Sequence, residues 1–456
     1  MKKIIILAFF LIMPTYVFAS DITQSSKITI DGNIYTKLTD NNENSYISIE
    51  KNKNIQIVNE EEDISGLYII YELKSINGII ENDTKSEKIG ANGFLHEYID
   101  VEKLIGASDS INLNYEEDVK IGEIYVLNKG QLPEYVEVWD KPCTEADLLL
   151  FSTHSDDEQL FFAGLMPTYI ARGAKVQVVY FTNHNDNPKR LHEQIHGLYK
   201  VGIMNYPVIG PVPDAWSDNL NWATSNLEKS GLTVDDAVNF EIEMIRRFKP
   251  LVVVGHDELG EYSHGQHILN THVLKIALEK TNDDTYDTES MEKYGLWDVP
   301  KTYLHLYKEN QIVLDYDIPL DYFNGKTAYE VSKEGYKEHH SQQYTWFTKW
   351  LTGVNDKGIG TPYTKASEIK KYSPCEYGLY RTLVGEDINK NDMFENLTLR
   401  KDEPQNEKIV EKVKNISKNI LNEKDDYWNE YKYYIICSTI IVLLLIIVVI
   451  NRKTKK

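Results

Sequence analysis

The spacing of apolar residues changes character near residue 143. Before this point, short β-branched and aromatic segments such as GLYIIYELK and SINLNYEE alternate with turns rich in Asn, Gly and Asp. Short alternating segments with frequent turns are typical of an antiparallel β-sandwich. We therefore predict a sandwich domain over residues 20–142, and a carbohydrate-binding role for it is left open.

After residue 143, apolar runs alternate with amphipathic segments. We expect strands at DLLLFST, KVQVVYFT, YPVIG and LVVVG, and helices over residues 156–172, 189–201, 234–248 and 264–278. Near-continuous apolar strands separated by helices predict βαβ units and a parallel sheet that is buried on both faces. The fold class predicted for residues 143–400 is therefore α/β, with a Rossmann-like parallel sheet and helices on both faces.

Both ends of the chain carry strongly apolar segments. A basic start, an apolar run and the small-residue site VFA predict a cleaved signal peptide over residues 1–19, with an uncleaved anchor as the alternative. Residues 433–451 suit a single C-terminal transmembrane helix, and the basic residues 452–456 should stay in the cytoplasm. Residues 401–432 are charged and periodic, as in a stalk. The expected location is the cell membrane, with the catalytic region on the extracellular side.

Charge and cysteine content narrow the classes of partner and metal site. The net charge of −21 argues against nucleic acid as a partner. Cys143 and Cys375 fall in the predicted external part, and the sequence leaves open whether they form a disulfide or two free, buried thiols. Because no paired CxxC spacing occurs, any metal must be held by His and carboxylate side chains.

The first candidate site is HSDDE, from His154 to Glu158, directly after the predicted strand DLLLFST. Open parallel sheets bind ligands beyond the carboxyl ends of their strands, and imidazole together with carboxylate suits zinc. A purely structural explanation is that Ser155 and Glu158 have the spacing of a capping box. That explanation accounts neither for His154 nor for the second acid.

The second candidate site is LVVVGHDELGEYSHGQH, residues 251–267, where another buried strand runs into a loop rich in His and acids. His264 and His267 are three apart at the start of a predicted helix, so they share a face. One can bind metal while the other faces a substrate. Because two strand ends each supply a His and acids, we predict that the two loops meet around one cation.

HSDDE, Arg190-x-x-Glu193 and HDELGEYSHGQH together resemble the motifs of the PIG-L/LmbE-like zinc N-deacetylase family. The first motif of that family reads AHPDDE, whereas Thr153 and Ser155 flank the histidine here. The resemblance covers about residues 143–310, and SPCEYGLYRTLVGED is similar to a stretch of longer extracellular members. It implies a Rossmann-like fold and removal of acetyl from N-acetylglucosamine-type groups. The order of the N-terminal strands resembles a galactose-binding-like (discoidin-type) module.

The resemblance also implies roles for individual residues. Zinc, or another divalent cation, would be held by His154, Asp157 and His267. Asp156 would be the general base, His264 would polarise or protonate the reacting group, and Arg190 would lie near the substrate. Three protein ligands leave zinc an open position for water.

We also expect a residue that orients one of the metal-binding histidines. Metal-bound histidines usually donate their second N–H to a partner that orients the ring. We expect His256 or Asp257 to orient His267 in this way.

The expected function is hydrolysis of the acetyl group of an N-acetylated amino sugar in a surface glycan or glycolipid. The substrate and the membrane, reached through the C-terminal helix, are the expected partners. Two alternatives stay open: a surface carbohydrate-binding protein with a structural or vestigial metal, and a zinc amidase acting on a non-sugar N-acyl group. Tyr344, Trp346, Phe347 and Trp350 form an aromatic cluster that could stack on sugars, although we favour core packing.

Overall fold

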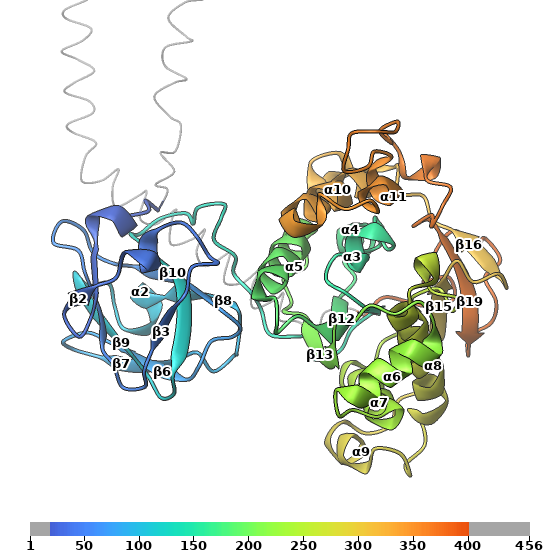
Figure 1. The fold of residues 1–456 in the computed structure, drawn as a ribbon, viewed down its shortest axis with the longest axis horizontal. Helices are drawn as coiled ribbons and strands as arrows, with labels where there is room; N and C mark the ends of the chain where they lie inside the picture. Colours follow the sequence, from blue (N-terminus) through green and yellow to red (C-terminus); the bar gives the residue numbers. More distant parts are fainter. Residues whose placement is uncertain (1–18, 401–456) are drawn as a thin grey trace, which may run out of the picture. The chain divides into compact units, whose positions relative to one another are not determined.

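A computed structural model describes residues 19–400 of the chain (Figure 1). The predictions made for residues 1–18 and 401–456, which include the signal peptide, the stalk, the transmembrane helix and the cytoplasmic tail, lie outside the described residues. Among residues 19–400, no helix is long and apolar enough to span a bilayer.

Two antiparallel sheets form a sandwich in the N-terminal part. One has the strand order β2-β1-β4-β9-β6-β7 and the other the order β3-β10-β5-β8. The alternating pattern of SINLNY explains this arrangement, because its Ile111, Leu113 and Tyr115 point into a common aliphatic core. The elements are β1 (Lys27–Ile30), β2 (Asn33–Ile34), β3 (Ile47–Ile49), β4 (Ile55–Val58), β5 (Gly66–Tyr71), β6 (Gly78–Glu81), β7 (Ser86–Ile89), β8 (His96–Asp100), α2 (Val101–Leu104), β9 (Ser110–Tyr115) and β10 (Val119–Leu127).

A seven-stranded sheet with the order β13-β12-β11-β14-β15-β19-β16 forms the second part. The strands from β13 to β15 pair in parallel, whereas β19 is antiparallel to both of its neighbours. This confirms the predicted α/β class. The strands are β11 (Leu148–Ser152), β12 (Val176–Asn183), β13 (Val208–Pro213), β14 (Val252–Gly255), β15 (Lys301–His305), β16 (Gln311–Val313) and β19 (Glu376–Thr382).

Helices cover both faces of this sheet, as the apolar strands require (Figure 1). Leu148 and Leu150 pack into one core with α4, α5 and α10, while Leu149 and Phe151 pack into another with α7 and α8. Strand side chains alternate between faces, so a continuous apolar run fills both cores. The helices are α3 (Asp157–Leu160), α4 (Leu165–Ala171), α5 (Pro188–Lys200), α6 (Leu220–Lys229), α7 (Val234–Phe248), α8 (Gly265–Lys280), α9 (Thr288–Tyr294), α10 (Ala328–Glu338) and α11 (Thr348–Thr352).

The strand order reverses direction between β11 and β14. Chain order runs outward from β11 through β12 to β13 on one side, and from β14 to β15 on the other. A crevice opens at such a switch point because the connections leave on opposite sides. The two candidate motifs follow β11 and β14, so the topology brings them to the same crevice.

Two expectations from the sequence need correction or completion. The single helix expected over residues 156–172 is two helices, α3 and α4, separated at Gly164. Gly164 has φ = 89°, and a Cβ there would lie 2.3 Å from the ring of Tyr316, so packing fixes the break. Cys143 and Cys375, for which a disulfide was left open, are free thiols.

Candidate active site

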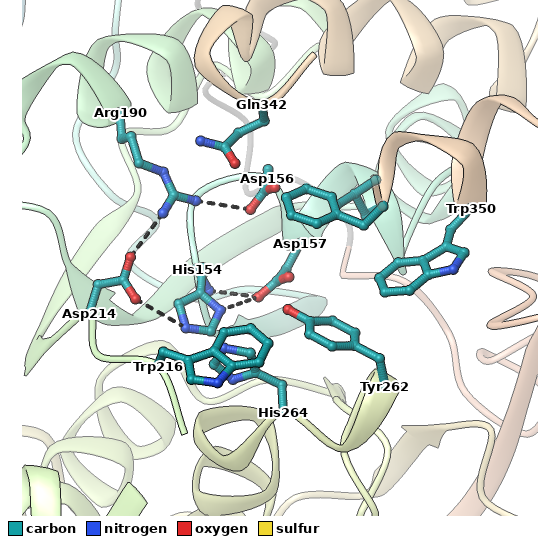
Figure 2. A pocket seen from close by; sticks show the side chains of 12 residues that line it. His154, Asp156, Asp157, Arg190, Asp214, Trp216, Tyr262, His264, Gln342 and Trp350 are labelled. Atoms are coloured by element: carbon teal, nitrogen blue, oxygen red, sulfur yellow. Dashed lines mark hydrogen bonds and ion pairs between the residues drawn. The ribbon is translucent and has the colours of Figure 1, made fainter. Parts of the chain in front are cut away.

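Three side chains from the two predicted loops converge on one point. His154 follows β11, Asp157 begins α3, and His267 lies in the first turn of α8. The Oδ2 atom of Asp157 lies 2.9 Å from Nδ1 of His154 and 3.1 Å from Nε2 of His267. The two imidazole nitrogens are 3.2 Å apart. The structure therefore brings together all three residues expected as metal ligands, and Figure 2 shows two of them, His154 and Asp157.

The far sides of both rings are held by acceptors. Nε2 of His154 lies 3.0 Å from Oε1 of Gln266, and Nδ1 of His267 lies 2.8 Å from Oε2 of Glu261. Each acceptor binds the N–H of its ring and leaves the other nitrogen free to bind a cation. This donor set, with two nitrogens and one carboxylate oxygen, fits zinc.

The electrostatics of this cluster favour positive charge. Burial alone would lower the pKa of His267, but Asp157 and Glu261 outweigh it and raise the pKa to about 10. Burial raises the pKa of Asp157, yet His267 and His154 hold it well below its usual range. Buried carboxylates need a compensating charge, so a bound cation can take the place of the protons on the imidazoles.

Glu261 is the residue that the sequence did not single out. Its side chain is fully buried, and besides His267 it contacts Nδ1 of His256 at 2.8 Å and Nδ1 of His305 at 2.6 Å. Asp257, one of the two groups expected to orient His267, instead accepts a hydrogen bond from the backbone N–H of Leu259. Glu261 therefore orients the ring of His267. His256 contacts the same carboxylate.

Asp156, the expected general base, lies beside the cluster of His154, Asp157 and His267. Its backbone has a rarely adopted conformation. Its φ is 126°, a region that residues with a Cβ seldom occupy. Nη2 of Arg190 lies 3.1 Å from its Oδ1, and Nη1 of Arg190 lies 2.9 Å from Oδ2 of Asp214. Burial raises the pKa of Asp156 to about 7, against the opposing effect of Arg190. A carboxylate with this pKa can exchange a proton near neutral pH.

His264 faces the same pocket as a neutral ring. Burial, together with the neighbouring imidazoles of His154 and His267, lowers its pKa to about 2. Its Nδ1 accepts a hydrogen bond from the backbone N–H of Gln266, so His264 is the N-cap of α8 and its ring proton lies on Nε2. The ring can therefore polarise a carbonyl by donating a hydrogen bond, whereas the resemblance had left protonation open as well.

The pocket around these groups has a volume of about 160 Å³ and a mixed lining. Its polar wall includes Arg190, Asp214 and Gln342, and its aromatic wall includes Trp216 and Tyr262 (Figure 2). In the expected aromatic cluster, Trp350 is buried and lines the pocket, whereas Trp346 is 50% exposed and Tyr344 is 82% exposed. The favoured interpretation of core packing therefore describes Trp350 but neither of the two exposed rings.

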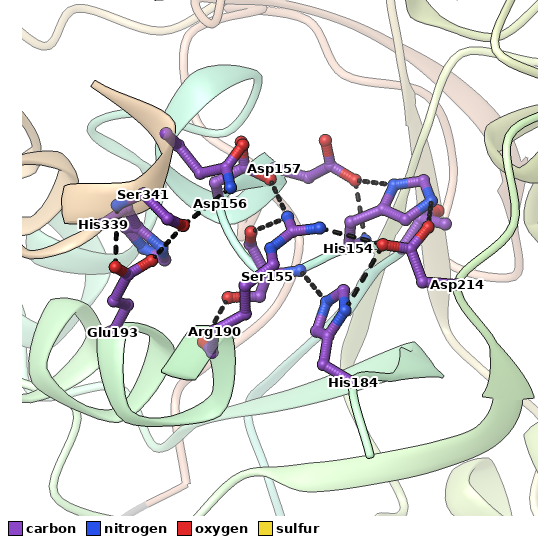
Figure 3. Close-up of polar contacts among 12 residues, drawn as sticks. His154, Ser155, Asp156, Asp157, His184, Arg190, Glu193, Asp214, His339 and Ser341 are labelled. Atoms are coloured by element: carbon purple, nitrogen blue, oxygen red, sulfur yellow. Dashed lines mark hydrogen bonds and ion pairs between the residues drawn. The ribbon is translucent and has the colours of Figure 1, made fainter. Parts of the chain in front are cut away.

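Several residues that build the site were not predicted. Asp214 follows β13 and contacts Nδ1 of His184 at 3.3 Å, and the backbone N–H of Ser155 donates to Nε2 of the same ring (Figure 3). Asp214 and His184 each follow the carboxyl end of a parallel strand. The rule that places sites at these strand ends, which led to HSDDE, could therefore also have found them.

The capping-box explanation of HSDDE is only partly right. Glu158 does reach back, but its Oε2 accepts from the backbone N–H of Asp156, and its Oε1 lies 2.7 Å from Nε2 of His339. Ser155 caps no helix, and its hydroxyl donates to the backbone oxygen of Arg190. Asp156 occupies the N-cap position of α3, but its side chain makes no capping hydrogen bond and contacts Arg190 instead.

Arg190 and Glu193 do not form a surface ion pair. Both are turned inward, and Glu193 accepts hydrogen bonds from the backbone N–H and the hydroxyl of Ser341 (Figure 3). On α5, Arg190 therefore lines the pocket. Glu193 binds Ser341 and so holds the segment that follows α10.

The family model described as "PIG-L: GlcNAc-PI de-N-acetylase" matches residues 149–278, which contain both motifs. Residues 149–278 are therefore similar to PIG-L domains. The matched residues run from β11 to α8, so they include the switch point and His154, Asp157 and His267.

Curated relatives of the chain include deacetylases and an amidase. The 1D-myo-inositol 2-acetamido-2-deoxy-alpha-D-glucopyranoside deacetylase 2 of Saccharopolyspora erythraea is 30% identical over 179 residues, which cover 34% of this chain and 63% of that protein. The mycothiol S-conjugate amidase of Streptomyces coelicolor is 28% identical over 169 residues, which cover 32% of this chain and 56% of that protein. The chain thus spans less than two thirds of either relative.

One similar solved structure is the N,N'-diacetylchitobiose deacetylase from Pyrococcus horikoshii, in complex with its inhibitor MPG. It shares 15% sequence identity, with a TM-score of 0.34, and the match covers 44% of this chain and 72% of that one.

Proposed function

We propose that this protein is a zinc-dependent deacetylase that hydrolyses the acetamido group of an N-acetylated amino sugar. The observation that carries the proposal is the convergence of His154, Asp157 and His267 beside Asp156 and the neutral ring of His264. The similarity to PIG-L domains and the deacetylase relatives support the same reaction.

The side chains around the metal site have the properties that amide hydrolysis requires. A bound zinc ion acts as a Lewis acid and lowers the pKa of water towards neutrality. Asp156 accepts a proton from the attacking water at its carboxylate and can return that proton to the leaving sugar amine. Arg190 contacts Oδ1 of Asp156 and so keeps the carboxylate turned towards the pocket.

His264 supplies a donor for the oxygen of the acetyl group. Negative charge develops on this oxygen as water attacks, and a donor already in place stabilises it without rearrangement. The Nε2–H of His264 is such a donor because its Nδ1 is occupied by the backbone N–H of Gln266.

The pocket wall supports a sugar as the substrate. Trp216 is 53% exposed and offers a ring face at the pocket, on the same side as Tyr262. Aromatic faces pack against the apolar faces of sugar rings while the hydroxyl groups find polar partners. Asp214 and Gln342 lie in the same lining and provide acceptors for hydroxyl groups.

The test is release of acetate from a panel of N-acetylated compounds by the metal-loaded protein. The panel contains free N-acetylglucosamine, N-acetylated oligosaccharides, a GlcNAc-bearing glycolipid and, as controls, N-acetylated amino acids. We expect acetate from the sugars, no acetate after chelation, and recovery on adding zinc. Acetate from the amino acids alone would indicate a non-sugar amidase, and sugar binding without any acetate would indicate a carbohydrate-binding protein.

A further inference from the structure

A second cluster of imidazoles and carboxylates lies where the sandwich meets α5, apart from the catalytic pocket. His96 comes from β8, Glu43 from the loop before β3, and His192 and His196 from α5. Glu137, from the segment that joins the sandwich to the seven-stranded sheet, completes the cluster. These residues play no part in the proposed deacetylation.

The side chains of this cluster point at one another. His196 lies 2.9 Å from Oε2 of Glu43 through Nε2 and 2.6 Å from Oε1 of Glu137 through Nδ1. Nδ1 of His96 lies 3.4 Å from Oε2 of Glu137, and Nε2 of His96 lies 2.8 Å from Nδ1 of His192. At this distance one neutral imidazole donates its N–H to the other, and the hydroxyl of Tyr68 lies 3.1 Å from Nδ1 of His96.

The charges of the cluster call for a cation. Two carboxylates, Glu43 and Glu137, face imidazoles at a junction where His96 and Glu137 are at most 5% exposed. One protonated imidazole balances one of the two negative charges, whereas a divalent ion among neutral imidazoles balances both. Buried charges are costly unless they are paired, so the ion gives the better balance.

The geometry also suits a metal. One ligand atom from each of Glu43, His96 and His196 lies within 4.8 Å of the others. Zinc binds imidazole nitrogen and carboxylate oxygen at about 2.0–2.2 Å, so small side-chain movements would bring these atoms to a common ion. The side chains of Glu43 and His196 are 26% and 25% exposed, which gives an ion a route from solvent.

We propose that Glu43, His96 and His196 form a second divalent-metal site, of the zinc class, between the sandwich and α5. His192 holds the ring of His96, and Glu137 holds the ring of His196. The ion ties a strand and a loop of the sandwich to the helix that carries Arg190. Its role is structural, because it fixes the position of α5 relative to the sandwich.

The test counts zinc ions per chain. The full chain, purified without a histidine tag, is stripped with chelator, equilibrated with micromolar ZnCl₂, desalted and measured by inductively coupled plasma mass spectrometry. We expect two zinc ions for the unchanged protein, one for His96→Ala, one for His267→Ala and none for the double variant. His272→Ala removes an exposed histidine on α8 and should retain two.

One zinc ion in the unchanged protein, retained by His96→Ala and lost by His267→Ala, would overturn the second site and leave the catalytic proposal standing. Circular dichroism shows whether His96→Ala is folded. If it is not, Glu43→Gln serves instead, because Glu43 lies in a partly exposed loop. Glu43→Gln should lose the second ion, and retention of both ions by this variant also overturns the proposal.

Discussion

Asp156 combines an unusual backbone with a catalytic position. A non-glycine residue at a φ of 126° costs on the order of 1–3 kcal/mol, and such strain collects at functional sites. We predict that Asp156→Asn retains zinc but loses turnover by roughly 10²–10⁴-fold, the usual contribution of a general base. Acetate release and zinc content are measured on the same preparation. Full activity with full zinc would show that another group takes the proton.

The pH dependence of the reaction follows from the same carboxyl group. Asp156 must be ionised to accept a proton, and burial raises its pKa to about 7. A nearby cation stabilises the ionised form, so the midpoint in the loaded enzyme lies at or below this value. We predict that kcat/KM rises with pH between about 5 and 7 and then levels off. A profile that is flat from pH 5 to 8 would contradict the assignment.

Glu261 is predicted to control the affinity for the metal. It accepts from Nδ1 of His267 at 2.8 Å, and its pKa is held well below the usual range because His256, His267 and His305 outweigh the effect of burial. Glu261→Gln should weaken zinc binding by about 10–100-fold, as loss of such an orienting group usually does. A competition titration with a chromophoric chelator measures the change. Glu258→Gln is the matched control, since Glu258 pairs with the half-exposed Lys275.

The sequence identified the two motifs that form the centre of the site but not the residues that support them, such as Glu261, His184 and Asp214. Strand prediction brought the two motifs after β11 and β14 together, and the family resemblance then singled out His154, Asp157 and His267 within them. Glu261 binds histidines from three different positions in the chain, and no local spacing reveals such a contact. Of the two residues expected to orient His267, His256 contacts Glu261 whereas Asp257 accepts a hydrogen bond from the backbone N–H of Leu259.

At the level of elements, apolar periodicity predicted the long helices well and the short ones poorly. The expected helices over residues 234–248 and 264–278 correspond to α7 (Val234–Phe248) and α8 (Gly265–Lys280). The break between α3 and α4 was missed because it depends on the ring of Tyr316, which packs against Gly164 from a distant part of the chain. Only tertiary contact reveals such a break.

Helix α7 contains a buried acid whose replacement should stabilise the protein. Glu241 is fully buried, and within residues 19–400 neither of its carboxylate oxygens has a hydrogen-bond partner. Replacing it with leucine removes the cost of burying an unsatisfied polar group, about 1–3 kcal/mol. Glu241→Leu should therefore raise the free energy of unfolding, measured with urea. Glu228→Leu, on an exposed position of α6, should not.

The stabilisation expected for Glu241→Leu should increase with pH. Burial raises the pKa of Glu241 well above its usual value, so the folded chain holds a proton that the unfolded chain releases. The contribution of Glu241 to stability therefore falls as pH rises above about 4.5, the usual pKa of the group. The benefit of leucine should be larger at pH 7.5 than at pH 4.5, and an equal benefit at both would contradict this account.

For the whole molecule, hydrophobic patterning was enough to predict the α/β class but not how the parts fit together. Continuous apolar strands require helices on both faces, and the structure has them. The contact of β8 with α5, through His96 and His192, joins residues nearly one hundred positions apart, and no pattern along the chain indicates it. The sugar-binding role left open for the sandwich stays a prediction.

The central claim is that the loops after β11 and β14 hold one cation between them. Crystals grown with zinc, measured above and below the zinc absorption edge, test it directly. We predict an anomalous peak within about 2.0–2.2 Å of Nδ1 of His154, Nε2 of His267 and a carboxylate oxygen of Asp157. Crystals of protein shown to contain zinc, but with no anomalous density at these three residues, would contradict the account.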